Sequence, residues 1–101
     1  MYEHLVVFKL KENVTAQMEQ ELLDKLQSFK GRIPGIVQLS AGINVTEETE
    51  NRHGFNLGLR VTFSDREALR QYSPHPLHQE FVRMLDGLLD SVVVVDYPFE
   101  L

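Results

Sequence analysis

The sequence predicts an α+β fold, a four-stranded antiparallel sheet in the ferredoxin-like βαββαβ order. Two observations support this class. Apolar and polar residues alternate in the middle of the chain, as in half-buried strands, and apolar residues recur at helical spacing in two other stretches. The chain is thus two strand–helix–strand halves joined by an acidic loop. In this arrangement helices cover one face of the sheet, and the first and last strands lie side by side.

The first strand is predicted over residues 2–10 and the first helix over residues 15–31. Strand formers fill positions 5–8, and apolar side chains point to both faces. Thr15 is expected to cap the helix and Gly31 to end it. The apolar side chains of the helix form one stripe: Met18, Leu22, Leu26, Phe29 and Ile33.

Two further strands are predicted over residues 36–46 and 55–63, because apolar and polar residues alternate in both. The acidic, polar loop at residues 46–54 connects them. Ser64 is expected to cap the short helix that follows, with the Glu67 side chain reaching back to complete a capping box.

The short helix is expected to end near Tyr72, because Pro74 cannot continue it, and Pro76 suits the first turn of a new helix. A strongly apolar strand is predicted over residues 92–97, stopped by Pro98. The apolar stripe of the last helix is predicted to be Leu77, Phe81, Met84, Leu85, Leu88 and Leu89.

Length and composition limit the class of protein. A chain of 101 residues is expected to form one domain, residues 1–101. The net charge of −5 works against binding to nucleic acid or anionic membrane, since both are polyanions. There is no cysteine, no signal peptide and no stretch near the ~20 apolar residues of a membrane helix. We therefore expect a cytoplasmic protein with no nucleic acid and no membrane partner.

The first and last strands are apolar on both faces. Leu5 and Val7, together with Val93 and Val95, are expected to form an apolar patch on the face without helices. A bare patch of this kind is an interaction surface, and its simplest cover is a second copy related by a two-fold axis. We predict a homodimer through the sheet face. The alternatives are cover by the C-terminal tail or by another protein.

The stretch from Tyr72 to His78 is the candidate site. His78 lies in the first turn of its helix, where the positive end of the helix dipole favours a neutral imidazole that can act as a base. If His4 faces the helices, it converges with Tyr72 and His78 on one cavity. The expected lining is apolar: Val6, Phe8, Leu22, Leu26, Phe81, Leu89 and Val94. The alternative is a His–Tyr pair that only satisfies hydrogen bonds at a helix junction.

No metal and no cofactor is predicted. His75 and His78 have a spacing compatible with metal binding. No third ligand is evident from the sequence, since His4 and Asp96 are the only candidates. Asp96 is otherwise assigned no chemical role. The chain has no Gly-rich phosphate loop.

Short motifs are spread along essentially the whole chain. They are His4 with Val6-Val7-Phe8-Lys9, Ile33-Pro34-Gly35, Gly42, Phe63-Ser64-Asp65 with Ala68-Leu69, Tyr72, His75-Pro76, His78, Phe81 and Asp96-Tyr97. Together they resemble the Dabb family of stress-responsive dimeric α/β-barrel domains. The resemblance implies a ferredoxin-like fold and a dimer whose two sheets close into a barrel.

A plant polyketide cyclase that closes an aromatic ring belongs to the family. The resemblance implies that Tyr72 and His78 correspond to its acid/base pair, and His4 to the first-strand histidine of its pocket. The chain departs from it at Leu26, where the cyclase has a tyrosine, and at Leu89, where it has a tryptophan. The substrate is therefore not implied.

The leading expectation is a homodimeric domain of unassigned reaction that binds a small apolar molecule between sheet and helices. One alternative is a cyclase or related lyase, in which His78 removes a proton and Tyr72 stabilises developing negative charge. Another is a purely structural stress protein. Whether the protein is an enzyme is left open.

Overall fold

The computed structural model describes residues 1–100 and has the predicted order of elements. The strands are β1 (Tyr2–Leu10), β2 (Ile36–Ile43), β3 (Leu57–Phe63) and β4 (Leu89–Pro98). The helices are α1 (Ala16–Gln27), α2 (Arg66–Tyr72) and α3 (Pro76–Leu85), with a 3₁₀ turn, η1 (Thr49–Asn51). The sheet order is β2-β3-β1-β4 and every neighbouring pair is antiparallel, which confirms the ferredoxin-like βαββαβ fold.

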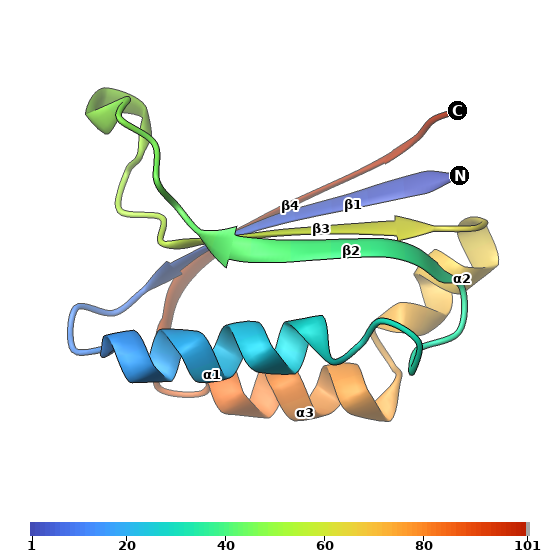
Figure 1. Ribbon diagram of the computed structural model, residues 1–101, viewed down its shortest axis with the longest axis horizontal. Helices are drawn as coiled ribbons and strands as arrows, with labels where there is room; N and C mark the ends of the chain where they lie inside the picture. The colour runs from blue at the N-terminus through green and yellow to red at the C-terminus, as the bar shows by residue number, and fades with distance from the viewer. Residues whose placement is uncertain (101) are drawn as a thin grey trace.

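The core lies between the sheet and the helices. Figure 1 shows α1 and α3 side by side on one face of the sheet, with α2 at one end. Most of the buried apolar residues come from the predicted alternating and helical stripes, but Leu23 and Tyr72 do not, and Met18 of the predicted stripe is 37% exposed. The buried apolar residues are Val6, Phe8, Leu10, Leu22, Leu23, Leu26, Phe29, Ile33, Leu57, Leu59, Val61, Phe63, Tyr72, Phe81 and Leu85. Burying one large apolar side chain contributes about 1.5–3 kcal/mol, so this core is the main source of stability.

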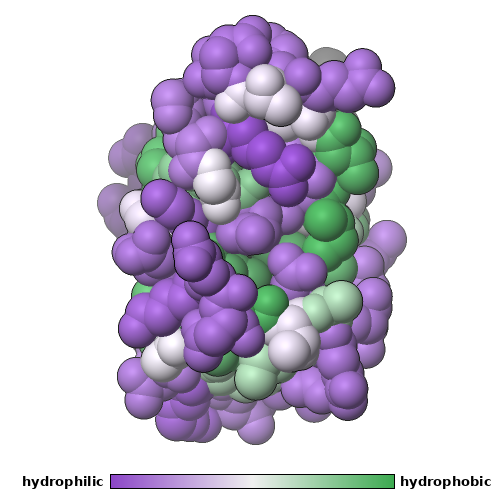
Figure 2. All heavy atoms as spheres, turned by 90° about the vertical axis from the view of Figure 1, so that its left-hand side faces the viewer, coloured by the Kyte–Doolittle hydropathy of each residue, from purple (hydrophilic) through white to green (hydrophobic). Residues whose placement is uncertain are grey.

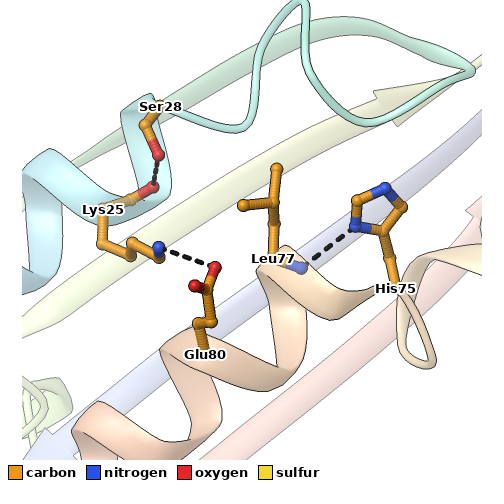
Figure 3. Close-up of polar contacts among 5 residues, drawn as sticks. All are labelled: Lys25, Ser28, His75, Leu77 and Glu80. Carbon is orange, nitrogen blue, oxygen red and sulfur yellow. Dashed lines mark hydrogen bonds and ion pairs between the residues drawn. The ribbon is translucent and has the colours of Figure 1, made fainter.

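An ion pair joins the two long helices on the outside of the core. The Nζ atom of Lys25 on α1 lies 3.1 Å from a carboxylate oxygen of Glu80 on α3 (Figure 3). The bond lowers the pKa of the Glu80 carboxyl. Solvent screens exposed pairs of this kind, so the pair adds little to stability.

Helix α1 begins where predicted but ends earlier. The Thr15 side chain accepts a hydrogen bond from the Met18 backbone N–H, which confirms the N-cap. The helix stops at Gln27 and not near Gly31. The reason is that the Phe29 N–H bonds to the Leu26 carbonyl, which tightens the chain into turns. These turns bring Phe29 into the core.

The cap of α2 differs from the prediction. The Asp65 side chain, and not that of Ser64, accepts the hydrogen bond from the Ala68 N–H, at 2.8 Å. The helix therefore begins one residue later than expected, and Glu67 accepts a hydrogen bond from Gln71 instead of closing a capping box.

Helix α2 packs closely on the turn before β2. Gly35 has a φ of +87°, and a β-carbon at this position would collide with the Ala68 side chain. Glycine is thus required twice, for the left-handed backbone and for the close approach. This contact holds the helix that ends at Tyr72.

The last strand is longer than predicted and the last helix is shorter. Helix α3 ends at Leu85, and β4 begins at Leu89 instead of at residue 92. Leu88 and Leu89 therefore do not belong to the helical stripe. The early start follows from pairing with β1, which extends past a bulge so that Leu89 lies opposite Leu10.

The predicted apolar face of β2 is interrupted at both ends. A bulge at Val37 turns that residue outward, and it is 40% exposed. The strand ends at Ile43, and Val45 lies beyond it, 85% exposed. Residues 44–56, which we term the arm, rise on the side of the sheet opposite the helices (Figure 1). Figure 2 shows that mainly hydrophilic residues cover the top of the arm.

In residues 1–100, the face of the sheet away from the helices carries no covering helix. The strand pairing places Leu5 opposite Val95 and Val7 opposite Val93. The three valines are 41–51% exposed, so the predicted apolar patch is present. None of the helices in the described part of the chain is long and apolar enough to cross a membrane.

The corrected cap of α2 gives the first prediction. Asp65→Ala should lower the free energy of unfolding by about 1 kcal/mol, because the Ala68 N–H loses its partner. Ser64→Ala is the matched control and should change it by less than half as much. Urea unfolding of both variants tests this, and equal losses would restore Ser64 as the cap.

Candidate functional site

Three rings meet at the end of the sheet where α2 packs. Tyr72 is the last residue of α2 and is 2% exposed. Its ring centroid lies 4.5 Å from that of His78 and 5.3 Å from that of His4, both edge to face. The structure therefore brings together the three polar residues that the sequence singled out, with Tyr72 in the middle.

The start of α3 positions His78. The His75 ring accepts a hydrogen bond from the Leu77 N–H through Nδ1, at 3.1 Å, and so caps the helix (Figure 3). Pro76 occupies the first turn, as predicted, and His78 follows two residues later. His75 thus has a structural use that explains its presence. No group of three or more potential metal ligands gathers in residues 1–100.

His78 is held as a neutral imidazole. Burial lowers the pKa of His78, and the nearby His4 and His75 lower it further, whereas the neighbouring Ser73 backbone acts in the opposite direction. Its Nδ1 atom is buried and has no hydrogen-bond partner among the described residues. An unpaired buried polar atom costs about 1–3 kcal/mol, so a group from outside the chain is the natural partner.

Tyr72 is held as a neutral phenol. Burial raises its pKa well above the ordinary value of 10.0, because the phenolate would lose its hydration. Such a phenol does not act as a base near neutral pH, but it donates a hydrogen bond. His78 and Tyr72 therefore offer complementary chemistry, one lone pair and one O–H, on adjacent rings.

Asp96 orients His4, a role that sequence reasoning missed. The Nδ1 atom of His4 lies 2.6 Å from a carboxylate oxygen of Asp96. A carboxylate on one ring nitrogen sets the tautomer and leaves Nε2 free to accept. The signal was in the strand order, since His4 is third in β1 and Asp96 is third from the end of β4. Antiparallel pairing of these strands makes them partners.

The apolar residues predicted to line a cavity divide into two groups. Most are packed in the core at 5% exposure or less: Val6, Phe8, Leu22, Leu26 and Phe81. Leu89 and Val94 lie at the edge of the sheet, on β4, and Val94 is 51% exposed. The best-formed hollows of residues 1–100 are lined by residues other than His4, Tyr72 and His78.

An open apolar edge lies beside the rings. Val94 is opposite Val6 on the helix side of the sheet, yet it is half exposed because β4 is an edge strand. On α3, Val82 follows His78 by one turn and is 44% exposed. The surface hollow of about 610 Å³ that Val82 and Leu89 line lies farther along α3, because Leu89 is opposite Leu10 and not opposite His4. We term Val82 and Val94 the apolar edge.

Comparison with protein families gives one match over nearly the whole chain. The model of the Stress responsive A/B Barrel Domain, Dabb, matches residues 2–99. The stress-response A/B barrel domain-containing protein HS1 of Arabidopsis thaliana is 30% identical over 96 residues, which cover 94% of this chain and 86% of that protein. Olivetolic acid cyclase of Cannabis sativa is 25% identical over 95 residues, 94% of this chain and 93% of the cyclase.

Solved structures share the fold. The crystal structure of At3g17210 from Arabidopsis thaliana has a TM-score of 0.85 and 27% identity, and covers 100% of this chain and 98% of that one. A protein of unknown function from Jannaschia, described as dimeric and ferredoxin-like, has a TM-score of 0.82 and 25% identity, with 97% and 98% covered.

The lowered pKa of His78 gives a prediction about stability and pH. Above the ordinary pKa of 6.5, His78 is neutral in both the folded and the unfolded chain and has no effect. Below this pH the unfolded chain binds a proton at His78 more readily than the folded chain does. The contribution of His78 to the free energy of unfolding therefore falls as pH falls, by up to about 1.4 kcal/mol per pH unit. The loss is complete below the pKa of the folded state.

Urea unfolding at several pH values tests this. Glutamine does not titrate, so His78→Gln should reduce the slope of the free energy of unfolding against pH below pH 6.5. His53→Asn, in the exposed arm, is the control and should keep it, since asparagine tolerates the positive φ of 50° at that position. Identical slopes for all three proteins would contradict the burial of a neutral His78.

Proposed function

Because the chain belongs to the stress responsive A/B barrel (Dabb) family, we propose that it is a homodimeric protein that binds a small, mainly apolar molecule beside His78 and Tyr72. The observation that carries the proposal is the buried Nδ1 atom of His78, which lacks a partner in the described chain. A core that served stability alone would be better without it.

The chemistry of the two rings favours a ligand with a hydroxyl or phenol group. A hydroxyl both donates and accepts, so it matches the Nδ1 atom of His78 in either tautomer. The O–H of Tyr72 offers a second contact to an oxygen of the ligand. The body of the ligand would lie against the rings and the apolar edge, where half-exposed valines gain most from being covered.

An acid/base enzyme is the second candidate. The neutral imidazole of His78 can take a proton from carbon or oxygen, and the Tyr72 O–H can stabilise the negative charge that develops on a substrate oxygen. The similarity to a protein named olivetolic acid cyclase supports this reading. A purely structural stress protein is the third candidate, in which the dimer alone is the function.

The homodimer is supported by two observations. The Jannaschia protein of the same fold is described as dimeric. The bare face of this chain carries half-exposed Val7, Val93 and Val95. Four strands about 4.8 Å apart present a flat surface of roughly 450 Å² per copy. The relief of the side chains and the residues of the arm add to this area, which brings it nearer to the size of a standard interface.

Binding of 1-naphthol, an apolar ring system with one hydroxyl, tests the ligand proposal. The wild-type protein should bind it, and His78→Ala and Tyr72→Phe should each weaken binding about three- to tenfold through loss of one hydrogen bond. His53→Asn is the control and should bind as the wild type does. Fluorescence titration measures all four proteins.

Equal affinity for wild type and His78→Ala, or no binding by either, would contradict the ligand proposal. The purely structural stress protein would then be the remaining candidate. The enzyme differs from the binder in turnover. An enzyme consumes a hydroxylated aromatic precursor and loses that activity in both variants, whereas a binder only retains the ligand.

Light scattering after size exclusion tests the dimer. The chain has a mass of 11.7 kDa, and the wild-type protein should elute with twice this mass. Val7→Lys should produce monomers, because it places a charge in the apolar patch. Val82→Lys is the matched control, since Val82 is similarly exposed but lies on the helix side. A monomeric wild type would refute the homodimer.

A further inference from the structure

Met18 is the residue of the predicted apolar stripe of α1 that does not reach the core. It is 37% exposed, whereas Leu22 and Leu26 on the same stripe are buried. It does not belong to the partly buried layer that packs against the core either. Apolar burial therefore does not account for a methionine at this position, and its sulfur has another contact.

The Met18 side chain takes part in the N-terminal cap of α1. The Thr15 hydroxyl accepts a hydrogen bond from the Met18 backbone N–H, at 3.2 Å. In return the Thr15 backbone N–H donates to the Met18 sulfur, at 3.5 Å from nitrogen to Sδ. These two contacts form a capping box. The residue three positions after the cap in such a box is normally Glu or Gln, and here a thioether takes the place of the carboxylate or amide oxygen.

The thioether is the weak side of this box. Sulfur in methionine is a poor hydrogen-bond acceptor, and the contact lies at the surface, where water competes for the Thr15 N–H. The geometry of the box is thus present, but one of its two hydrogen bonds is weak. An oxygen atom attached to the sulfur would give the Thr15 N–H an acceptor of ordinary strength.

Oxidation by a peroxide supplies this oxygen. Hydrogen peroxide transfers one oxygen atom to a lone pair of the Met18 sulfur. The S–O bond forms, the O–O bond breaks, the sulfur loses two electrons, and water leaves as the reduced product. The resulting sulfoxide carries its oxygen on the third side-chain atom, as glutamine does. Methionine sulfoxide reductases reverse the reaction.

We propose that Met18 is a site of reversible methionine oxidation, at which the sulfoxide oxygen completes the capping box of α1 and stabilises the protein. The oxidant is a peroxide, which reaches the sulfur from solvent because the side chain is exposed. Helix α1 supplies Leu22, Leu23 and Leu26 to the core, so a firmer start of this helix stabilises the whole fold.

Met84 shows why the effect at Met18 is unusual. Met84 is partly buried and packs against the core from α3. A sulfoxide there would place a polar group in apolar packing, which is the ordinary, destabilising result of methionine oxidation. The two residues therefore differ in how readily they are oxidised and in the sign of the effect on stability.

Peptide mapping by mass spectrometry, after brief treatment with dilute hydrogen peroxide, tests the site. Met18 should be oxidised several times faster than Met84, because its sulfur is exposed. Met1 is equally exposed, at 37%, and should react as well, so its contribution is separated below with a variant. Oxidation of Met84 before Met18 would overturn the assignment.

Thermal unfolding tests the effect on stability. With Met18 fully converted and Met84 intact, the oxidised wild type should have a Tm about 2–4 °C above that of the untreated protein. Reduction by methionine sulfoxide reductases should return the Tm to its starting value. Met18→Gln, with an amide oxygen at the same point, should reach the higher Tm without peroxide.

Met18→Leu is the matched control for the peroxide treatment. It is still oxidised at Met1 but has no sulfur at the cap, so its Tm should be the same before and after treatment. An equal or lower Tm for the oxidised wild type, or for Met18→Gln, would contradict the stabilising role of the sulfoxide.

Amide hydrogen exchange, followed by NMR, tests the hydrogen bond itself. Exchange of the Thr15 N–H should slow at least about twofold in the oxidised wild type and in Met18→Gln, because this N–H gains a better acceptor. The Ala68 N–H, which Asp65 caps on α2, is the internal control and should exchange at an unchanged rate. Unchanged exchange at Thr15 would show that the sulfoxide does not complete the box.

Discussion

Strand β1 pairs with β3 on one side and with β4 on the other, and the register of these two ladders decides which way each side chain of the candidate site points. His4, Val6 and Phe8 face the helices, whereas Leu5 and Val7 face away. A slip of one residue would exchange the two sets. The ring cluster, the core and the apolar patch therefore share one determinant, since all of them depend on how the first strand is held between its neighbours.

Burial has opposite effects in the apolar core and at the pair of Tyr72 and His78. In the core it stabilises the fold, but at Tyr72 and His78 it removes water from polar groups and keeps both uncharged. This burial costs stability at the pair, which is in keeping with the ligand site proposed above. Asp96 lies at the open edge and stays partly hydrated, so it can orient His4 without the cost of a buried charge.

Periodicity was enough to predict the order of elements, because each strand and helix shows its own repeat. It also placed His78 in the first helical turn, since Pro76 marks that turn. The end of α1 and the cap of α2 depend on which of several neighbouring groups forms a hydrogen bond. The sequence alone does not show whether Ser64 or Asp65 caps α2. The role of Asp96 depends on its partner His4 on another strand, so the pairing register was needed to find it.

The hydrogen bond between His4 and Asp96 joins residues 92 positions apart in the chain. A contact of such long range requires the closure of a loop that spans most of the chain, which is slow compared with the formation of local contacts. During synthesis the first strand emerges long before its partner β4, so His4 has no carboxylate to orient it until the last strand leaves the ribosome. The site is therefore assembled only in a chain that has been completed through β4, and a product truncated before β4 would expose an unpaired edge of β1 to the quality-control machinery of the cell.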